Sequence, residues 1–302
     1  MIKGNQVIIP TPFNEQGEID ERSLINLLDH VMNLGTEGVI TLGTTGEFYA
    51  LTNAEKKRII DIASERLKGR ASLTVGASHS GTDIAAELAA YASEKGADAV
   101  LVTPPYYGQV TTEGMIQHFA TIGLIGNIDL MIYDGGGGVE VPVGVIDQVR
   151  QLTTRMRYLK LTTPKPSKVR EIHEAFGGEV GVLAGEDLLI MPELIEGAIG
   201  LTTAAGNLRA DVLTNIFQLV QEKRYQEAQV LHDRHIAPQA IVTGSIRNEF
   251  IQCFKFALKE MGVIACDKVR LPLTPLSEAR KQNLKQMLIN QQLISAAEGS
   301  LV

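Results

Sequence analysis

A lysine stands near the end of an apolar segment, where a charged side chain costs free energy. Lys160 lies in the run 157–162, which is typical of a short buried strand. Burial disfavours the ammonium form, so a lysine there can become the free amine that attacks a ketone and forms a Schiff base. The alternative is that its side chain reaches the surface or pairs with a carboxylate.

Hydroxyl groups and glycines follow another apolar segment. Gly43, Thr44, Thr45 and Gly46 come directly after residues 38–42. Glycines permit a tight turn with exposed N–H groups, and the hydroxyl groups add donors, so this turn suits a carboxylate. An ordinary glycine-containing loop is the alternative interpretation.

Tyrosines follow two further apolar segments. Tyr133 ends the run 130–133, and Tyr107 follows the run 99–102 and two prolines. A tyrosine at a strand end can donate and accept a proton beside an imine, or it can be a core aromatic residue whose hydroxyl group binds the backbone. An amine nucleophile, a carboxylate anchor and a phenol together meet the needs of Schiff-base chemistry.

The elements that must position these residues alternate along the chain. Amphipathic stretches of helical period, such as 19–28 and 52–60, separate the apolar runs, and Thr52 or Asn53 is a candidate N-cap. Eight strands are predicted: 7–9, 38–42, 72–75, 99–102, 130–133, 158–161, 180–183 and 198–201. This alternation predicts an α/β fold, a closed (β/α)8 TIM barrel, with the candidate residues at the carboxyl ends of the strands.

The strand pattern stops after Asn207, and three further amphipathic helices are predicted at about 224–240, 245–261 and 276–293. We therefore expect a barrel over residues 1–223 and a C-terminal three-helix extension over residues 224–302. Because no low-complexity linker separates them, we expect one folding unit.

Composition limits the function classes. The 302 residues carry a net charge of −7, with 44% hydrophobic and 21% charged residues, which excludes a disordered chain and makes nucleic acid an improbable partner. No apolar run is long enough to cross a membrane, and we expect a cytoplasmic protein. Cys253 and Cys266 are expected as buried thiols, and His232 with His235 as part of a solvated helix face. No metal site and no cofactor are expected.

Several motifs spread over nearly the whole chain resemble one known family. The sequence resembles the dihydrodipicolinate synthase and N-acetylneuraminate lyase family of class I aldolases. The segments that carry the resemblance are Pro10-Thr11-Pro12-Phe13, Gly43-Thr44-Thr45-Gly46-Glu47, Pro105-Tyr106-Tyr107, Tyr133, Lys160, Gly185-Glu186-Asp187 and Arg270-Leu271-Pro272-Leu273.

The resemblance implies roles for the candidate residues. Lys160 would form the imine with pyruvate or a longer 2-oxo acid, with Tyr133 as the principal acid and base. Thr44 would join the proton relay, and Tyr107 would complete it, commonly from a neighbouring subunit of a homotetramer, a dimer of dimers. The substrate-binding set would be Gly43, Thr44, Thr45, Gly46, Gly185 and Thr202.

Two departures from the family pattern bear on the substrate. After Tyr133 the family usually has an asparagine and, in the synthases, a loop with an arginine for the second substrate's carboxylate; this chain has Asp134, four glycines, Val139 and Glu140. Neither glycine nor glutamate replaces a bidentate arginine. We expect Asp134 and Glu140 to be solvated loop charges.

The second departure follows Lys160, where residues 161–165 resemble the branch that acts on 2-oxo-3-deoxy sugar acids. We therefore expect dehydration or retro-aldol cleavage of such an acid. The alternatives are 4-hydroxy-tetrahydrodipicolinate synthase, which condenses pyruvate with aspartate semialdehyde, another 2-oxo-acid lyase, and a non-catalytic barrel that binds a small anion.

Overall fold

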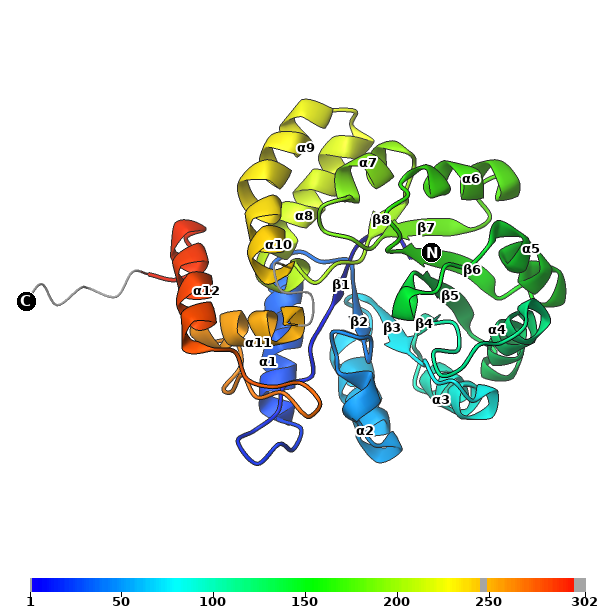
Figure 1. Ribbon diagram of the computed structural model, residues 1–302, viewed down its shortest axis with the longest axis horizontal. Helices are drawn as coiled ribbons and strands as arrows, with labels where there is room; N and C mark the ends of the chain where they lie inside the picture. The colour runs from blue at the N-terminus through cyan, green and yellow to red at the C-terminus, as the bar shows by residue number, and fades with distance from the viewer. Residues whose placement is uncertain (1, 245–248, 296–302) are drawn as a thin grey trace, which may run out of the picture.

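The eight predicted strands form a closed parallel barrel in chain order, as Figure 1 shows. The computed structural model describes residues 2–244 and 249–295. The barrel closes where β1 pairs with β8, with Gly4 opposite Gly200 and Asn5 opposite Leu201. The strands are β1 (Gly4–Ile8), β2 (Gly38–Thr41), β3 (Ser72–Gly76), β4 (Ala99–Val102), β5 (Asp129–Asp134), β6 (Met156–Leu161), β7 (Gly181–Ala184) and β8 (Gly200–Leu201).

Helices connect the strands and cover the barrel. The apolar outer faces of the strands pack against them in one large core. The helices are α1 (Glu21–Asn33), α2 (Asn53–Leu67), α3 (Thr82–Glu94), α4 (Thr112–Gly126), α5 (Val143–Leu152), α6 (Ser167–Phe176), α7 (Ile190–Ile195) and α8 (Gly206–Gln221), with short 3-10 helices at Phe48–Ala50 and Gly136–Gly138. Of the two N-cap candidates, Thr52 is the N-cap of α2, and it forms a capping box with Glu55.

The inside of the barrel is filled by a second, smaller cluster. Successive side chains of a strand point to opposite faces, so alternate residues of each strand reach this cluster. Its members include Ile8, Ile40, Leu101, Met131, Tyr158 and Leu183. Ile2 lies below them and donates its N–H to the Tyr158 hydroxyl group at 3.0 Å. The inside of the barrel is therefore filled with side chains.

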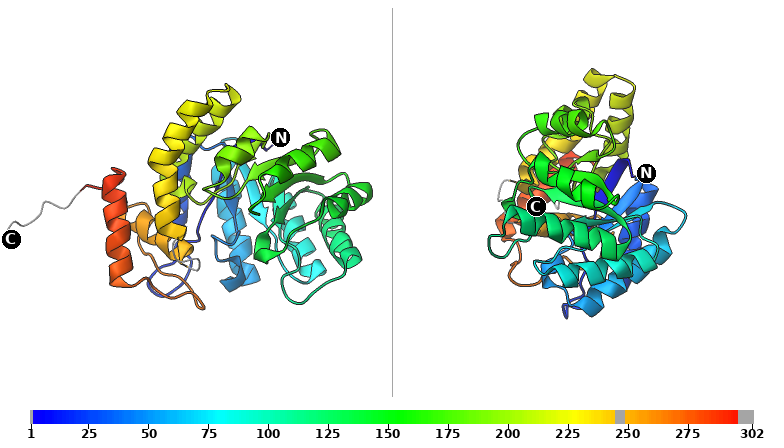
Figure 2. Two further views of the ribbon diagram at one scale, coloured as in Figure 1. Left: turned by 45° about the horizontal axis from the view of Figure 1, so that its top comes forward. Right: turned by 90° about the vertical axis from the view of Figure 1, so that its right-hand side faces the viewer.

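The C-terminal helices lie on one side of the barrel (Figures 1 and 2). They are α9 (Tyr225–Leu231), a π-helical turn (His232–Ile236), α10 (Ala237–Gly244), α11 (Phe250–Glu260) and α12 (Glu278–Asn290). Of these, α9 and α11 pack against α8, and α12 packs against α10 and α11. The predicted three-helix extension is confirmed with shifted boundaries; residues 245–248 and 296–302 of that prediction lie outside the described residues. In the described part of the chain, no helix is long and apolar enough to cross a membrane.

Two local predictions are wrong and one is confirmed. Leu42, predicted as strand, has φ of 57° because the chain turns there. His232 is buried rather than solvated, and its Nε2 lies 3.0 Å from the carbonyl oxygen of Asp187, because the π-helical turn directs it toward the barrel. Cys253 and Cys266 are free, buried thiols, as expected.

Candidate active site

Lys160 lies inside the barrel, two residues beyond Tyr158 on the same face of β6. Its side chain is 3% exposed. Tyr133 occupies the equivalent place on β5, two residues beyond Met131, and the two strands pair with Tyr133 opposite Lys160. The Nζ atom of Lys160 lies 4.4 Å from the centroid of the Tyr133 ring. The predicted nucleophile and the predicted phenol are therefore neighbours.

The surroundings of Lys160 answer the alternative left open by the sequence. Its side chain does not reach the surface, and within residues 2–244 and 249–295 no carboxylate forms an ion pair with it. A buried amine beside a phenol, without a carboxylate partner, has the placement that a Schiff-base nucleophile requires.

Gly185, directly after β7, leaves the space that the lysine side chain occupies. A Cβ atom at this position would lie 2.5 Å from the carbonyl oxygen of Leu161 and 3.1 Å from Cε of Lys160. Only glycine fits there without displacing the lysine side chain or the backbone of β6.

The turn after β2 is closed by its own backbone. The N–H of Gly46 donates to the Gly43 carbonyl oxygen and the N–H of Glu47 to the Thr44 carbonyl oxygen, both at 3.0 Å. The Thr11 hydroxyl group donates to the Gly46 carbonyl oxygen at 2.8 Å and ties the turn to the segment after β1. Thr45 is buried and Thr44 partly exposed. The turn thus holds two hydroxyl groups at the carboxyl end of the barrel.

Glu47 fixes this turn to the C-terminal helices, a role that the sequence reasoning missed. Its carboxylate is fully buried and forms an ion pair with the equally buried Lys255 of α11. It also accepts the backbone N–H of Arg270 at 2.9 Å, and Nζ of Lys255 lies 4.0 Å from the Phe13 ring centroid. An acidic residue inside a motif of glycines and threonines was the available signal, since buried acidic groups need partners.

Thr202 follows β8 and is completely buried. Its N–H donates to the Ala184 carbonyl oxygen at 2.7 Å, while its hydroxyl group has no hydrogen-bond partner within the described residues. A buried hydroxyl group without a partner at this rim can serve a ligand.

Within one chain, the structure does not place the Tyr107 side chain beside Lys160. Its side chain is 87% exposed on the loop after β4, and its N–H donates to the Ser80 hydroxyl group at 3.0 Å. Among the described residues no hydrogen bond joins the hydroxyl groups of Thr44, Tyr107 and Tyr133. The predicted relay is therefore incomplete in a single chain.

Asp134 is not the solvated loop charge that we expected. Its side chain is 0% exposed, and its Oδ2 lies 2.5 Å from Nζ of Lys168 on α6. The reason is strand alternation: Tyr133 points into the barrel, so the next residue points outward beneath the helices. Glu140 is exposed, as expected, but it pairs with Lys165 at 2.9 Å and with Lys168 at 3.3 Å.

Two further carboxyl groups lie near the end of β7. Burial, with a smaller effect of Glu186, raises the pKa of Glu193 on α7 to about 8. Burial likewise raises the pKa of Asp187 to about 6, although Thr203 counteracts it by hydrogen bonding. Glu193 thus holds its proton at neutral pH and does not add a charge near Gly185.

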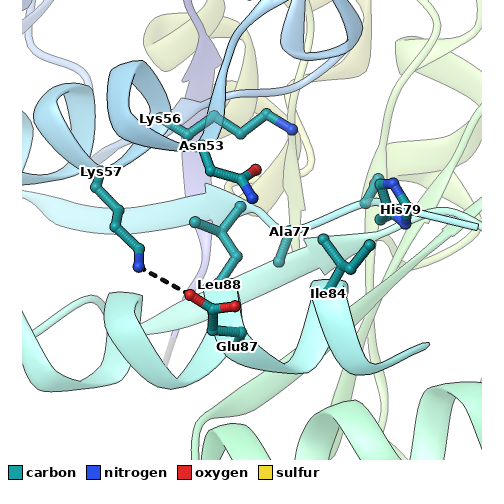
Figure 3. Close-up of a pocket in the computed structure, with 9 residues that line it drawn as sticks. Asn53, Lys56, Lys57, Ala77, His79, Ile84, Glu87 and Leu88 are labelled. Atoms are coloured by element: carbon teal, nitrogen blue, oxygen red, sulfur yellow. Dashed lines mark hydrogen bonds and ion pairs between the residues drawn. The ribbon is translucent and has the colours of Figure 1, made fainter. Parts of the chain in front are cut away.

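A separate small pocket lies outside the barrel wall between α2 and α3 (Figure 3). Asn53 and Lys56 of α2 face Ile84 and Leu88 of α3 across it. Burial lowers the pKa of Lys56. None of the predicted site residues lines this pocket. Elsewhere in the described ranges, no three His, Cys, Asp or Glu side chains are grouped so that they could hold a metal ion.

Known relatives match the chain over almost its entire length. A sequence model of the Dihydrodipicolinate synthetase family matches residues 1–291. The 4-hydroxy-tetrahydrodipicolinate synthase of Bartonella bacilliformis is 32% identical over 300 residues, which are 97% of this chain and 99% of the relative. The enzyme of the same name from Aquifex aeolicus is 30% identical and covers 95% of this chain and 97% of its own.

Solved structures agree with the fold. The crystal structure of dihydrodipicolinate synthase from Aquifex aeolicus superposes with a TM-score of 0.92 at 30% identity and covers 97% of this chain and 99% of its own. The crystal structure of the chloride-inhibited dihydrodipicolinate synthase of Acinetobacter baumannii, complexed with pyruvate, superposes with a TM-score of 0.91 at 28% identity. It covers 97% of this chain and 100% of its own.

These matches confirm the resemblance seen in the motifs. Members of the family are lyases of the class I aldolase type, which react through a lysine Schiff base. With a family match over residues 1–291 and relatives at 30% identity or more, the chain belongs to the dihydrodipicolinate synthetase family.

Proposed function

We propose that this protein forms a Schiff base between Lys160 and the ketone of a pyruvate-type 2-oxo acid. The observation that carries the proposal is the buried amine of Lys160, 4.4 Å from the Tyr133 ring centroid and without an ion-pair partner in the described residues. The amine nitrogen adds to the carbonyl carbon, and the carbonyl oxygen leaves as water once it has been protonated.

Tyr133 moves the protons in this proposal. A phenol beside the amine can protonate the leaving oxygen and then accept a proton from the carbon next to the imine, which gives the enamine. Thr44 and Thr45 hold the substrate carboxylate with their hydroxyl and N–H groups, and the buried hydroxyl group of Thr202 offers a further hydrogen bond.

Borohydride trapping tests this function. The protein is incubated with pyruvate or a 2-oxo-3-deoxy sugar acid, reduced, digested and mapped by mass spectrometry. We expect one adduct, on Lys160, and none in Lys160→Ala. No adduct with any of these acids would support the alternative of a non-catalytic barrel that binds a small anion.

Two observations favour different second substrates. The names of the relatives favour condensation of pyruvate with aspartate semialdehyde over the sugar-acid reaction that we expected from the sequence. The loop after Tyr133 favours the sugar acid, because residues 135–140 contain no cation and the Glu140 carboxylate is already held by Lys165 and Lys168. A second carboxylate has no bidentate partner there.

Product analysis separates the two reactions. Pyruvate plus aspartate semialdehyde is one assay, and 2-oxo-3-deoxy pentonates and hexonates are the other. Pyruvate plus an aldehyde as products indicates retro-aldol cleavage, and a dioxo acid indicates dehydration. Turnover only with aspartate semialdehyde would remove the sugar-acid candidate.

We also propose that Tyr107 acts in the site of a neighbouring copy within a homotetramer. Its 87% exposed side chain supports this, because a relay residue needs a partner that one chain does not provide. Mixing Lys160→Ala and Tyr107→Phe chains after mild dissociation tests it. We expect activity to return in the mixed oligomers, and a monomer in sedimentation experiments would contradict the proposal.

A further inference from the structure

The loop between β5 and α5 is closed at its base by a buried ion pair. Asp134 ends β5, and its Oδ1 accepts the N–H of Val141 at 2.8 Å. Lys168 of α6 lies 2.5 Å from the other carboxylate oxygen and donates to the Val141 carbonyl oxygen at 2.8 Å. Residues at both ends of the loop, Asp134 and Val141, therefore bind the same lysine, Lys168, whose side chain is 3% exposed.

The loop needs such a closure because of its composition. Residues 135–138 are four glycines, the residue type that loses most conformational freedom on ordering. Two further hydrogen bonds help to close the loop. The Gly135 N–H donates to the Val139 carbonyl oxygen at 2.9 Å, and the Thr162 hydroxyl group donates to the Asp134 carbonyl oxygen at 3.0 Å.

The glycine segment contacts the catalytic phenol directly. A Cβ atom on Gly136 would lie 2.9 Å from Cγ of Tyr133 and 2.8 Å from Cγ2 of Thr103. The backbone at Gly136 thus packs against the Tyr133 ring, whose centroid lies 4.4 Å from Nζ of Lys160. The path of the loop limits where the phenol can lie above the amine.

We propose that Asp134 and Lys168 are positioning residues that hold the Tyr133 ring over Lys160 through the segment Gly135–Gly138. The pair touches neither the amine nor the phenol, and it acts by fixing the backbone that packs on the phenol. This inference rests on the proposed function of Tyr133 as the proton carrier.

The exchange of the pyruvate methyl protons with D2O, followed by NMR, measures this effect without a second substrate. For Lys168→Met we expect the maximal exchange rate to fall roughly tenfold to hundredfold, with the KM for pyruvate changed less than about threefold. Lys165→Met is the matched control, because Lys165 pairs with Glu140 on the exposed side of the same loop. It is expected to exchange at the wild-type rate.

A double-mutant cycle distinguishes positioning from a general structural effect. In the Tyr133→Phe background the further change Lys168→Met is expected to cost nothing more, because the phenol that the pair positions is already absent. Losses that multiply in the double variant would overturn the inference.

A paired variant covers the case in which Lys168→Met does not fold. Asp134→Leu with Lys168→Met replaces a buried ion pair by apolar groups, which generally keeps a protein folded. It is expected to show the same loss of exchange, and a wild-type exchange rate in this folded variant would overturn the inference.

Fluorine NMR separates failure of the inference from failure of the proposed function. If the wild-type protein gives no exchange and no adduct with pyruvate or with a 2-oxo-3-deoxy sugar acid, the proposed function is wrong. The position of Tyr133 is still measurable in 3-fluorotyrosine-labelled protein, with its resonance assigned by Tyr133→Phe. We expect this resonance to move in Lys168→Met but not in Lys165→Met, and an unmoved resonance would contradict the positioning role.

Discussion

Nζ of Lys160 lies 4.4 Å from the centroid of the Tyr133 ring, on the neighbouring strand of a closed barrel. A phenol above an amine offers the negative face of its ring to the ammonium form and its hydroxyl group to the oxygen that leaves during imine formation. Substituting each side chain separately therefore distinguishes the role of the amine from the role of the phenol.

Lys160→Ala is expected to give a folded protein without a covalent adduct. The change removes a buried amine whose ion-pair partner is absent from the described residues, so we expect no loss in the free energy of unfolding. Mass spectrometry after borohydride reduction measures the adduct, and urea unfolding measures stability. An unfolded variant would show that the lysine mainly serves structure.

Tyr133→Phe is expected to lower kcat by about 10² to 10⁴, the range of general acid and base catalysis. Binding of the 2-oxo acid should change little, because the proposed carboxylate anchor, Thr44 and Thr45, is unchanged in this variant. Steady-state kinetics together with calorimetric binding to Lys160→Ala and to Lys160→Ala/Tyr133→Phe measures both effects. An unchanged kcat would remove Tyr133 from the mechanism.

Gly185→Ala is expected to slow adduct formation at least tenfold, because the new Cβ would lie 3.1 Å from Cε of Lys160. Gly144→Ala is the control: this position in α5 has no atom within 4 Å of an added Cβ. The rate of borohydride-trapped adduct compares the two variants. Equal rates would show that the close approach of Gly185 to the lysine has no functional consequence.

Lys255→Met is expected to lower the free energy of unfolding by about 3 to 5 kcal/mol, because it leaves the buried carboxylate of Glu47 unpaired. Arg58→Met, which breaks the exposed pair with Glu21, is expected to cost about 1 kcal/mol or less. Urea unfolding of both variants tests the difference. The prediction that residues 224–302 fold with the barrel requires one transition, and two separate transitions would contradict it.

Glu193→Gln is expected to remove a pH dependence of stability. The pKa of Glu193 is raised from 4.5 to about 8 in the folded protein, so the unfolded chain loses this proton first as the pH rises. Stability therefore falls between these pH values, by about 3 kcal/mol up to pH 7. Thermal unfolding from pH 4.5 to 8 should show a smaller decline in Glu193→Gln than in Glu174→Gln, an exposed control.

The sequence predicts those parts of the protein that depend on local periodicity. All eight apolar runs are strands, and the position of Lys160 inside the barrel follows from its place two residues after Tyr158. The same alternation, applied to Asp134, would have placed that carboxylate under the helices, where a cation has to meet it.

Contacts between distant segments were not predictable in this way. Glu47 and Lys255 are far apart in the chain, and nothing in their own neighbourhoods identifies one as the partner of the other. Tyr107 shows the opposite problem. Its motif is recognisable in the sequence, but its side chain is 87% exposed, and the residues that it would contact lie outside the single chain.

The link between Glu47 and the C-terminal helices also has a consequence for the order in which the protein is completed during synthesis. The turn after β2 leaves the ribosome early, whereas Lys255 and the N–H of Arg270, which hold its buried carboxylate, are translated near the end. A nascent chain that has finished all eight strands still lacks the groups that neutralise this carboxylate. The turn that holds Thr44 and Thr45 therefore matures late, and we expect shortened chains that end before Lys255 to form the strands but not to bind a 2-oxo acid.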